Sequence, residues 1–425
     1  MLGGILMKQH IAFMLAALLC VGLTGCNQKT NDRENIKNSI SNEQFGNKEK
    51  DLNTPTVEIV DHHGTHIGSI FQNTGTTLTN NGIFYSTVYS ENVSTDTIST
   101  EITDGNKETV TYHLYDLQTN NDYVLGSIPD QDYEAGYSRT ELNGKLYTLI
   151  TTGNALDQIP DPLFLAEFDL ITHTVNQFRI SNNGFPYTAM TSVNGKLLIM
   201  NHDQTDKLDD ILYLFEPDNS ETKEVLRFEL KDDSGDTIRQ MYSDGENVYL
   251  LRLRFENKSV KMFLDTYDND FNKLSERDIS SFLEKGSDNS LVSDDIENEM
   301  KQMVSKFMVL DKRFVYYENF SISRFFGNLE NGEILEETKG VGDQFLAASG
   351  SGNPFFYYAF GGGKNENAVF ELKNNSLSKS FFKADDTRYY ITAASINQNG
   401  NRLIQVDYIN PDDGNDTLPT KLYYI

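Results

Sequence analysis

The chain has 425 residues, of which 23% are charged, and its formal net charge is −27. A surface this acidic argues against nucleic acid or anionic lipid headgroups as the main partner, because their phosphates would be repelled. Tryptophan is absent, whereas tyrosine (22) and phenylalanine (26) are plentiful, a composition that suits half-buried strands.

The first residues have the pattern of an export signal. Lys8 precedes an apolar segment over residues 11–23, which is short for a membrane span and is followed by small residues. The four residues Leu23-Thr24-Gly25-Cys26 resemble the lipobox of bacterial lipoproteins, in which the cysteine thiol receives the lipid. This resemblance implies that residues 1–25 are a signal peptide and that the mature chain is held at the extracytoplasmic face of the cell membrane by palmitate-type acyl chains on Cys26.

The segment after Cys26 differs in composition from the rest of the chain. Residues 26–55 are rich in Asn, Lys, Glu and Ser and contain one aromatic residue, Phe45. Such a segment buries too little apolar surface to offset its chain entropy, so we expect a flexible tether. The only other cysteine, Cys20, lies in the signal peptide, so the exported body over residues 56–425 has no thiol or disulfide.

A turn that leads into a short apolar strand recurs through the body, at intervals of about 50 to 60 residues in the first half. Asn-Gly supplies the two positive-φ residues of a type I′ turn, so each copy predicts a β-hairpin. The turn markers in chain order are Asn81-Gly82, Asn143-Gly144, Asn194-Gly195, Asp244-Gly245, Asp311-Lys312, Gly352-Asn353 and Asn399-Gly400.

The same order of strands returns after each marker. The apolar strand, for example 145–149, 196–200 or 247–253, is followed by an aromatic-rich strand such as 111–117, 163–170, 211–215 or 262–267. A polar turn then leads to a last strand, as in 123–128, 175–180, 223–230 and 273–279. With the strand before each marker, this makes four strands per unit, which is typical of a β-propeller blade.

We therefore predict an all-β fold, a β-propeller of seven four-stranded blades. The last unit is one strand short, and a lone strand over residues 56–61 precedes the first unit, so this strand is expected to close the ring as the outer strand of the last blade. Six or eight blades, or tandem β-sandwiches, are the alternatives. One helix is expected over residues 293–306, where Ser293 is a cap and Met300 shares a face with nearby apolar residues.

Propeller sites commonly lie at the mouth of the central channel. The candidate loops are 151–162, 201–210, 361–367 and 410–420, together with the connections between blades. In these connections Tyr137, Tyr187 and Tyr389 accompany Asp and Asn, and such tyrosines stack on sugar rings; the alternative is that they are ordinary strand-end and turn residues.

Three arginines, Arg139, Arg239 and Arg388, come near the starts of innermost strands. If they point into the channel they form an anion-binding clamp; otherwise they bond to carbonyl groups at the blade ends. We therefore name these three arginines and the three tyrosines as candidate ligand-binding residues.

No catalytic motif is recognisable. The chain has no Gly-x-Ser-x-Gly, no His-Glu-x-x-His and no phosphate-binding glycine loop. We predict no cofactor or metal; calcium at the acidic turns 232–236 and 412–416 is an alternative, although neither has the full spacing of a calcium loop. His62, His63 and His66 look like metal ligands on paper, but neighbouring strand residues point to opposite sides.

The chain resembles the propeller lipoproteins of bacteria in architecture and lipobox, and this resemblance specifies no substrate. The leading hypothesis is a binding or scaffold module that recognises a protein, peptide or glycan at the cell surface. The alternative is an enzyme, a lyase or hydrolase at the channel mouth acting on an anionic or sugar substrate.

Overall fold

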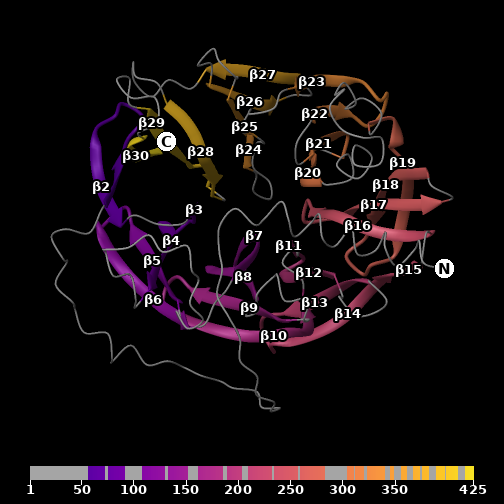
Figure 1. The fold of residues 1–425 in the computed structure, drawn as a ribbon, viewed down its shortest axis with the longest axis horizontal. Helices are drawn as coiled ribbons and strands as arrows, with labels where there is room; N and C mark the ends of the chain where they lie inside the picture. The colour runs from indigo at the N-terminus through magenta and orange to yellow at the C-terminus, as the bar shows by residue number, and fades with distance from the viewer. Residues whose placement is uncertain are drawn as a thin grey trace, which may run out of the picture.

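The structure is a computed structural model. It describes residues 56–71, 75–90, 108–129, 133–151, 161–184, 189–202, 209–231, 234–256, 259–282, 304–310, 312–319, 323–339, 345–348, 356–360, 367–373, 376–381, 389–397, 399–409 and 417–425. Within this part of the chain the strands form seven sheets arranged as a ring (Figure 1). The prediction of a seven-bladed β-propeller is confirmed.

The first three blades each have four antiparallel strands in chain order. Blade 1 contains β3 (Thr76–Leu78), β4 (Ile83–Ser90), β5 (Glu108–Asp116) and β6 (Asn121–Pro129). Blade 2 contains β7 (Tyr133–Leu142), β8 (Lys145–Thr151), β9 (Asp161–Asp169) and β10 (Thr174–Gly184). Blade 3 contains β11 (Ala189–Val193), β12 (Lys196–His202), β13 (Asp210–Glu216) and β14 (Glu221–Phe228).

Blade 4 has a fifth, two-residue strand, which pairs with the start of the strand that follows it. It contains β15 (Leu230–Lys231), β16 (Ser234–Ser243), β17 (Val248–Glu256), β18 (Ser259–Tyr267) and β19 (Lys273–Asp278), and a 3₁₀ turn, η2 (Ser280–Phe282), follows. Blade 5 contains β20 (Val304–Leu310), β21 (Phe314–Asn319), β22 (Ser323–Asn328) and β23 (Ile334–Lys339). Blade 6 contains β24 (Phe345–Ala348), β25 (Phe356–Phe360), β26 (Asn367–Lys373) and β27 (Ser376–Phe381).

Blade 7 closes the ring with the start of the chain. Its own strands are β28 (Tyr389–Ile396), β29 (Arg402–Ile409) and β30 (Thr417–Tyr424), and the sheet continues with β1 (Thr56–Val60) and β2 (His66–Phe71). The predicted closing strand is confirmed in β1. However, β1 pairs parallel to β30, and β2 rather than β1 is the outermost strand. The blade is therefore five-stranded.

The predicted helix over residues 293–306 is wrong at its end. Residues 304–306 belong to β20, and residues 293–303 lie outside the described part. In the Val304–Leu310 segment, Phe307 and Val309 are both buried against blade 4, which gives the period of two expected of a strand. Among the described residues, no helix is apolar and long enough to cross a membrane.

Among the predicted turns that the structure describes in full, two have the expected two-residue form. Asn143 (φ 53°) and Gly144 (φ 76°), and likewise Asn194 (φ 47°) and Gly195 (φ 75°), have positive φ. In blades 1, 4 and 7 the turns are longer, and polar side chains close them: the Asp244 carboxylate, for example, accepts the N–H groups of residues 246 and 247. The marker over residues 352–353 lies outside the described residues.

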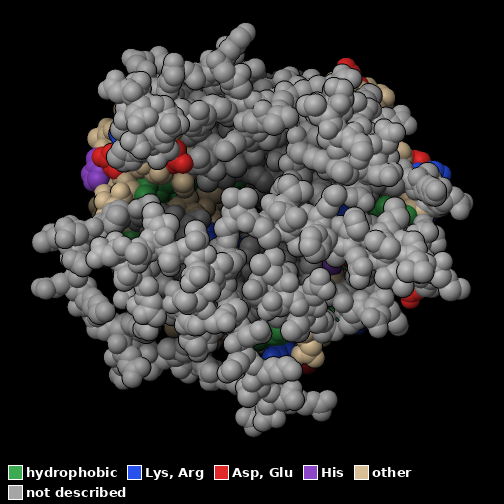
Figure 2. Space-filling view, viewed as in Figure 1, with side chains coloured by type: hydrophobic (Ala, Val, Ile, Leu, Met, Phe, Trp, Pro, Cys, Tyr) green, Lys and Arg blue, Asp and Glu red, His purple; other side chains and the backbone are tan. Residues whose placement is uncertain are grey.

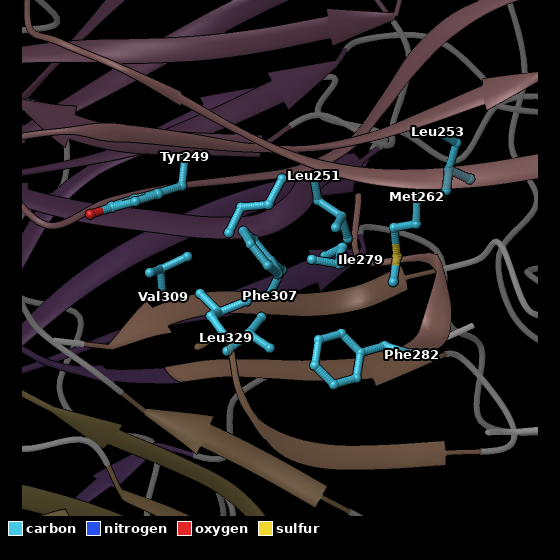
Figure 3. Close-up of a cluster of buried hydrophobic side chains, with 11 residues drawn as sticks. Tyr249, Leu251, Leu253, Met262, Ile279, Phe282, Phe307, Val309 and Leu329 are labelled. Atoms are coloured by element: carbon cyan, nitrogen blue, oxygen red, sulfur yellow. The ribbon is translucent and has the colours of Figure 1, made fainter. Parts of the chain in front are cut away.

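The apolar core lies between the blades. Each sheet turns one face to the preceding blade and the other to the following blade, so successive residues of one strand enter different seams. In β17, Tyr249, Leu251 and Leu253 belong to one buried cluster with Phe307 of blade 5 (Figure 3), whereas Leu250 belongs to the cluster shared with blade 3. The seam between blades 4 and 5 is a continuous cluster of buried side chains, which fixes these two sheets to each other.

Two tyrosines of blade 1 cover the outer edge of the closing strand β2. The Tyr115 hydroxyl accepts a hydrogen bond from the backbone N–H of Ser69, and the Tyr85 hydroxyl accepts one from Phe71. Tyr115 lies so close to Gly68 that a Cβ there would be 2.0 Å from its hydroxyl oxygen. The edge N–H groups of β2 are thus paired within the ring, which holds the closing hairpin to blade 1 as well as to blade 7.

Candidate functional site at the blade 3–blade 4 seam

The two faces of the ring are defined by strand direction. The strand nearest the centre in Figure 1 is the first of its blade, except in blade 4, where it is β16. We call these the inner strands; β7 contacts β11, β11 contacts β16, β16 contacts β20, β24 contacts β28 and β28 contacts β3. We call the face on which the inner strands begin the upper face. The loops that join the second and third strands open on it, whereas the Asn-Gly turns lie on the opposite, lower face. Since β1 is parallel to β30, and β30 runs in the direction of β28, the chain also enters the ring on the upper face.

At the upper face, His202 and Asp210, the described ends of the predicted loop over residues 201–210, lie beside the start of β16 in blade 4; residues 203–208 lie outside the described part. His202 ends β12 and Asp210 begins β13, and the two residues are directly opposite in the ladder. The Nδ1 atom of His202 bonds to Oδ1 of Asp210. The other carboxylate oxygen, Oδ2, accepts the Thr237 hydroxyl at 2.7 Å and the Ile238 N–H at 2.5 Å. One carboxylate therefore joins two strands of blade 3 to β16 of blade 4.

The carboxyl group of Asp210 is held in its ionised form. Burial opposes ionisation, but the charge and hydrogen bond of His202 and the hydrogen bonds of Thr237 and Ile238 outweigh it and keep the pKa of Asp210 below its usual range. Only 4% of the Asp210 side chain is exposed, against 21% for His202. The carboxylate thus lies within the seam, and the imidazole is at its border with solvent.

Next to this group, arginines and carboxylates of blade 4 neutralise one another. Arg252 is 1% exposed and bonds to Asp265 (2.7 Å), Asp236 (2.8 Å) and Glu276 (2.7 Å). Arg254 also bonds to Asp236, at 2.9 Å. Although burial acts in the opposite direction, these two arginines keep the pKa of Asp236 below its usual value. A buried cation with three carboxylate partners is a structural network, since an unpaired charge there would be costly.

The candidate arginines have different surroundings. Arg139 and Arg239 do lie in the inner strands β7 and β16. Arg139 donates to the Thr77 hydroxyl at 2.9 Å and packs over the Phe84 ring, so it connects blade 2 to blade 1. Arg239 is half-buried and is the extra residue of a β-bulge between Ile238 and Gln240. It therefore directly follows the backbone N–H that binds Asp210.

The other candidates are only partly covered by the structure. Tyr187 and Arg388 lie outside the described residues, while Tyr137 and Tyr389 belong to β7 and β28 with side chains that are not described. A ligand-binding role for these six residues stays a prediction. The structure brings together Asp210, at the end of one predicted loop, and the strand of one predicted arginine, Arg239.

The possible calcium turns do not provide a described site. The carboxylate of Asp236 is engaged by Arg252 and Arg254, and residues 232–233 and 412–416 lie outside the described part. No three His, Cys, Asp or Glu side chains within the described ranges are arranged to hold a metal ion.

The histidines after β1 lie in an exposed hairpin, at the edge of the ring where Figure 1 places β2 and Figure 2 shows histidine side chains gathered. Asp61 does not face a metal there, because its carboxylate accepts the N–H groups of His63 and Thr65, both at 2.8 Å. His66 bonds to Glu58 at 3.1 Å. These residues close a turn and pair two strands.

The sequence reasoning missed the pairing of His202 with Asp210 and Thr237. A signal was present: His202 and Asp210 flank a polar loop at the end of one apolar strand and the start of the next. The contribution of Thr237 has no local signal, because it comes from the next blade. Also missed was a second repeated turn, in which Asp116 and Asp169 each accept two N–H groups of the turn that follows.

The seven sheets, the order of their strands and the shared closing blade define the chain as a β-propeller. Comparison with solved structures finds propellers of low sequence identity. The C-terminal WD40 domain of Sif2 is 13% identical, with 87% of this chain and 98% of that chain covered and a TM-score of 0.40. The β-propeller domain of the Trilobed protease from Pyrococcus furiosus is 12% identical, with 81% and 98% covered and a TM-score of 0.43. No protein-family model and no curated protein matches this chain.

Proposed function

We propose that this protein is a lipid-anchored, extracytoplasmic binding module whose ligand, a glycan, peptide or protein, is bound at the upper face of the ring. The observation that carries the proposal is the pairing of the described charges at the blade 3–blade 4 seam. Arg252, Arg254 and Asp236 hold the strands of blade 4 to one another, which suits a rigid platform. Binding by a rigid surface loses little conformational entropy.

The path of the chain supports the location of the binding face. The predicted tether, residues 26–55, runs into Thr56, and β1 starts on the upper face. An anchor on Cys26 therefore joins the ring on the face that carries the loop over residues 201–210. As a coil, such a tether has a root-mean-square reach of roughly 30 Å, which keeps this face within reach of molecules at the membrane surface.

The anchor is tested by a Cys26→Ala variant in the natural host or a related bacterium. We expect the unchanged protein to incorporate labelled palmitate and to sediment with membranes, and the variant to do neither. The same amount of Cys26→Ala variant in the membrane fraction would contradict the anchor.

Binding is tested separately on the body over residues 56–425, by a screen of soluble cell-wall fragments and by co-purification with cross-linked surface proteins. Retention of a glycan, peptide or specific protein partner is expected. Failure of both screens would contradict the binding function.

One observation favours a second candidate, an enzyme at the channel mouth. His202 is bonded to a buried carboxylate, which is how proteins orient a general acid or base, and Arg239 lies next to the group. Release of product from the cell-wall fragments by the wild-type body, absent in a His202→Gln variant, would favour this candidate over a binding module.

A further inference from the structure

Strand β2 is less buried than β1, the other strand that the start of the chain contributes to blade 7. Ile70 is the one buried residue of β2, whereas β1 has three, Val57, Ile59 and Val60. Segments with little buried apolar surface open at a lower free energy than the core of a fold. Since β1 pairs with β30 on its other side, β2 can leave blade 7 without breaking the closure of the ring.

His113 of β5 lies beside the end of β2. Its ring stacks on Tyr85 at 4.7 Å and is 6.1 Å from the ring of Phe71, the last residue of β2. The His113 side chain is 9% exposed, and its Nε2 atom is 3.1 Å from the Thr87 hydroxyl. Its Nδ1 atom is buried and has no hydrogen-bond partner among the described residues. Movement of β2 away from blade 1 therefore gives water access to this ring.

A proton on His113 has no hydrogen-bonded counter-charge while β2 is in place. In the nearest carboxylate, Asp122 of β6, Oδ1 is 3.8 Å from Nδ1, which is longer than a hydrogen bond, and Oδ2 accepts the Tyr85 hydroxyl. The other ionisable groups on this face of blade 1 are the phenols of Tyr85 in β4 and Tyr115 in β5. Burial raises the pKa of both phenols, so both are neutral. Residues 67–71 of β2 contribute no ionisable group.

The two tyrosines also tie this face of blade 1 to β2. Tyr85 accepts the Phe71 N–H while its own hydroxyl donates to Asp122, and Tyr115 accepts the Ser69 N–H. A buried imidazolium without a hydrogen-bonded counter-charge is costly, and the cost disappears when the ring reaches water. Acid therefore favours a state in which β2 has moved away from His113.

We propose that β2 is an acid-sensitive latch, in which protonation of His113 favours the detachment of β2 from blade 1 while β1 keeps the ring closed. The latch goes beyond the proposed binding function and does not depend on what the ring binds. Detachment also frees the N–H groups of Ser69 and Phe71 from the two tyrosines. Acid thereby exposes a strand edge at the rim of the ring, which is the part of a sheet that pairs with other chains.

The latch is tested by hydrogen–deuterium exchange of the body over residues 56–425 at pH 7 and pH 5, after correction for the intrinsic pH dependence of exchange. A His113 pKa of about 4 in the closed state and 6.5 in water means that the opening constant of β2 rises about twentyfold between these pH values. At pH 5 we expect β2 to be roughly tenfold or more less protected than β12, which reports opening of the ring itself. Equal protection of β2 and β12 would overturn the proposal, because β2 then opens only with the whole ring.

Two variants identify the sensor. His113→Gln removes the ionisable ring, and His113→Phe does so while keeping an aromatic stack on Tyr85, so the rise should disappear in both. His173→Gln is the matched control and should keep the rise, because His173 also stacks on a tyrosine, Tyr123, but lies in the turn between β9 and β10. An undiminished rise in the His113 variants would show that another group is the sensor. No rise in the wild type would show that protonated His113 pairs with Asp122 inside the closed blade, and either result overturns the proposal.

Discussion

We expect the folded protein to lose stability on mild acidification because His113 is buried. Its side chain is buried in the seam that closes the ring, where it stacks on Tyr85 at 4.7 Å and its Nε2 atom lies 3.1 Å from the Thr87 hydroxyl. Burial lowers the pKa of His113 from 6.5 to about 4. Because the folded state holds the neutral ring, its stability is complete above pH 6.5 and falls as the pH drops toward 4.

The size of the effect follows from the two pKa values. The full difference corresponds to about 3.4 kcal/mol of unfolding free energy below pH 4, and about 2 kcal/mol is already lost at pH 5. The nearest carboxylate, Asp122, offsets little of this cost, since its Oδ1 atom is 3.8 Å from Nδ1 and its Oδ2 atom accepts the Tyr85 hydroxyl.

The assay is urea unfolding of the body at pH 7 and pH 5, for the wild type and a His113→Gln variant. Carboxylates and the other histidines titrate in both proteins, so the difference between the two pH dependences isolates His113. We expect the wild type to lose about 2 kcal/mol more than the variant between these pH values. Equal pH dependence of the wild type and His113→Gln would refute the reasoning.

Three substitutions test the packing within blade 4 and around the closing strands by chemical unfolding. Arg252→Met leaves Asp265 buried without its guanidinium partner and is expected to cost about 3–5 kcal/mol. Gly68→Ala places a Cβ 2.0 Å from the Tyr115 hydroxyl and is expected to cost about 1–3 kcal/mol by pushing β2 from blade 1. Ile59→Ala empties a fully buried position in β1 and is expected to cost about 2–5 kcal/mol.

Each substitution has a matched control. Lys273→Met removes a half-exposed charge that also contacts Asp265, and an effect as large as that of Arg252→Met would show that burial is not the cause. At Gly75 an added Cβ meets its nearest atom at 3.8 Å, so Gly75→Ala should be mild, and equal costs at Gly68 and Gly75 would contradict the proposed clash. Thr56→Ala, at the exposed start of β1, should change stability little; a wild-type-like Ile59→Ala would mean that β1 does not hold the ring closed.

Sequence alone determined the repeated order of strands and the ring closure. Turn residues and the alternation of apolar side chains act between near neighbours, so Asn143-Gly144 and the strand after it could be recognised without knowing the fold. The lone strand before the first blade and the missing strand in the last were complementary, which identified β1. The parallel pairing of β1 and the added strand β2 could not be predicted from the sequence. The outer edge of β2 is bonded by Tyr85 and Tyr115, which belong to another blade.

Only the tertiary structure determined which side chains meet in the seams between blades. Whether residue 304 begins a strand or ends a helix depends on the apolar face that blade 4 offers to Phe307 and Val309. Likewise, Thr237 meets Asp210 only because blade 4 packs against blade 3. Local patterns specify the strands of a blade, but the partner of a buried polar group in a seam belongs to the next sheet, so only the packing of the blades reveals it.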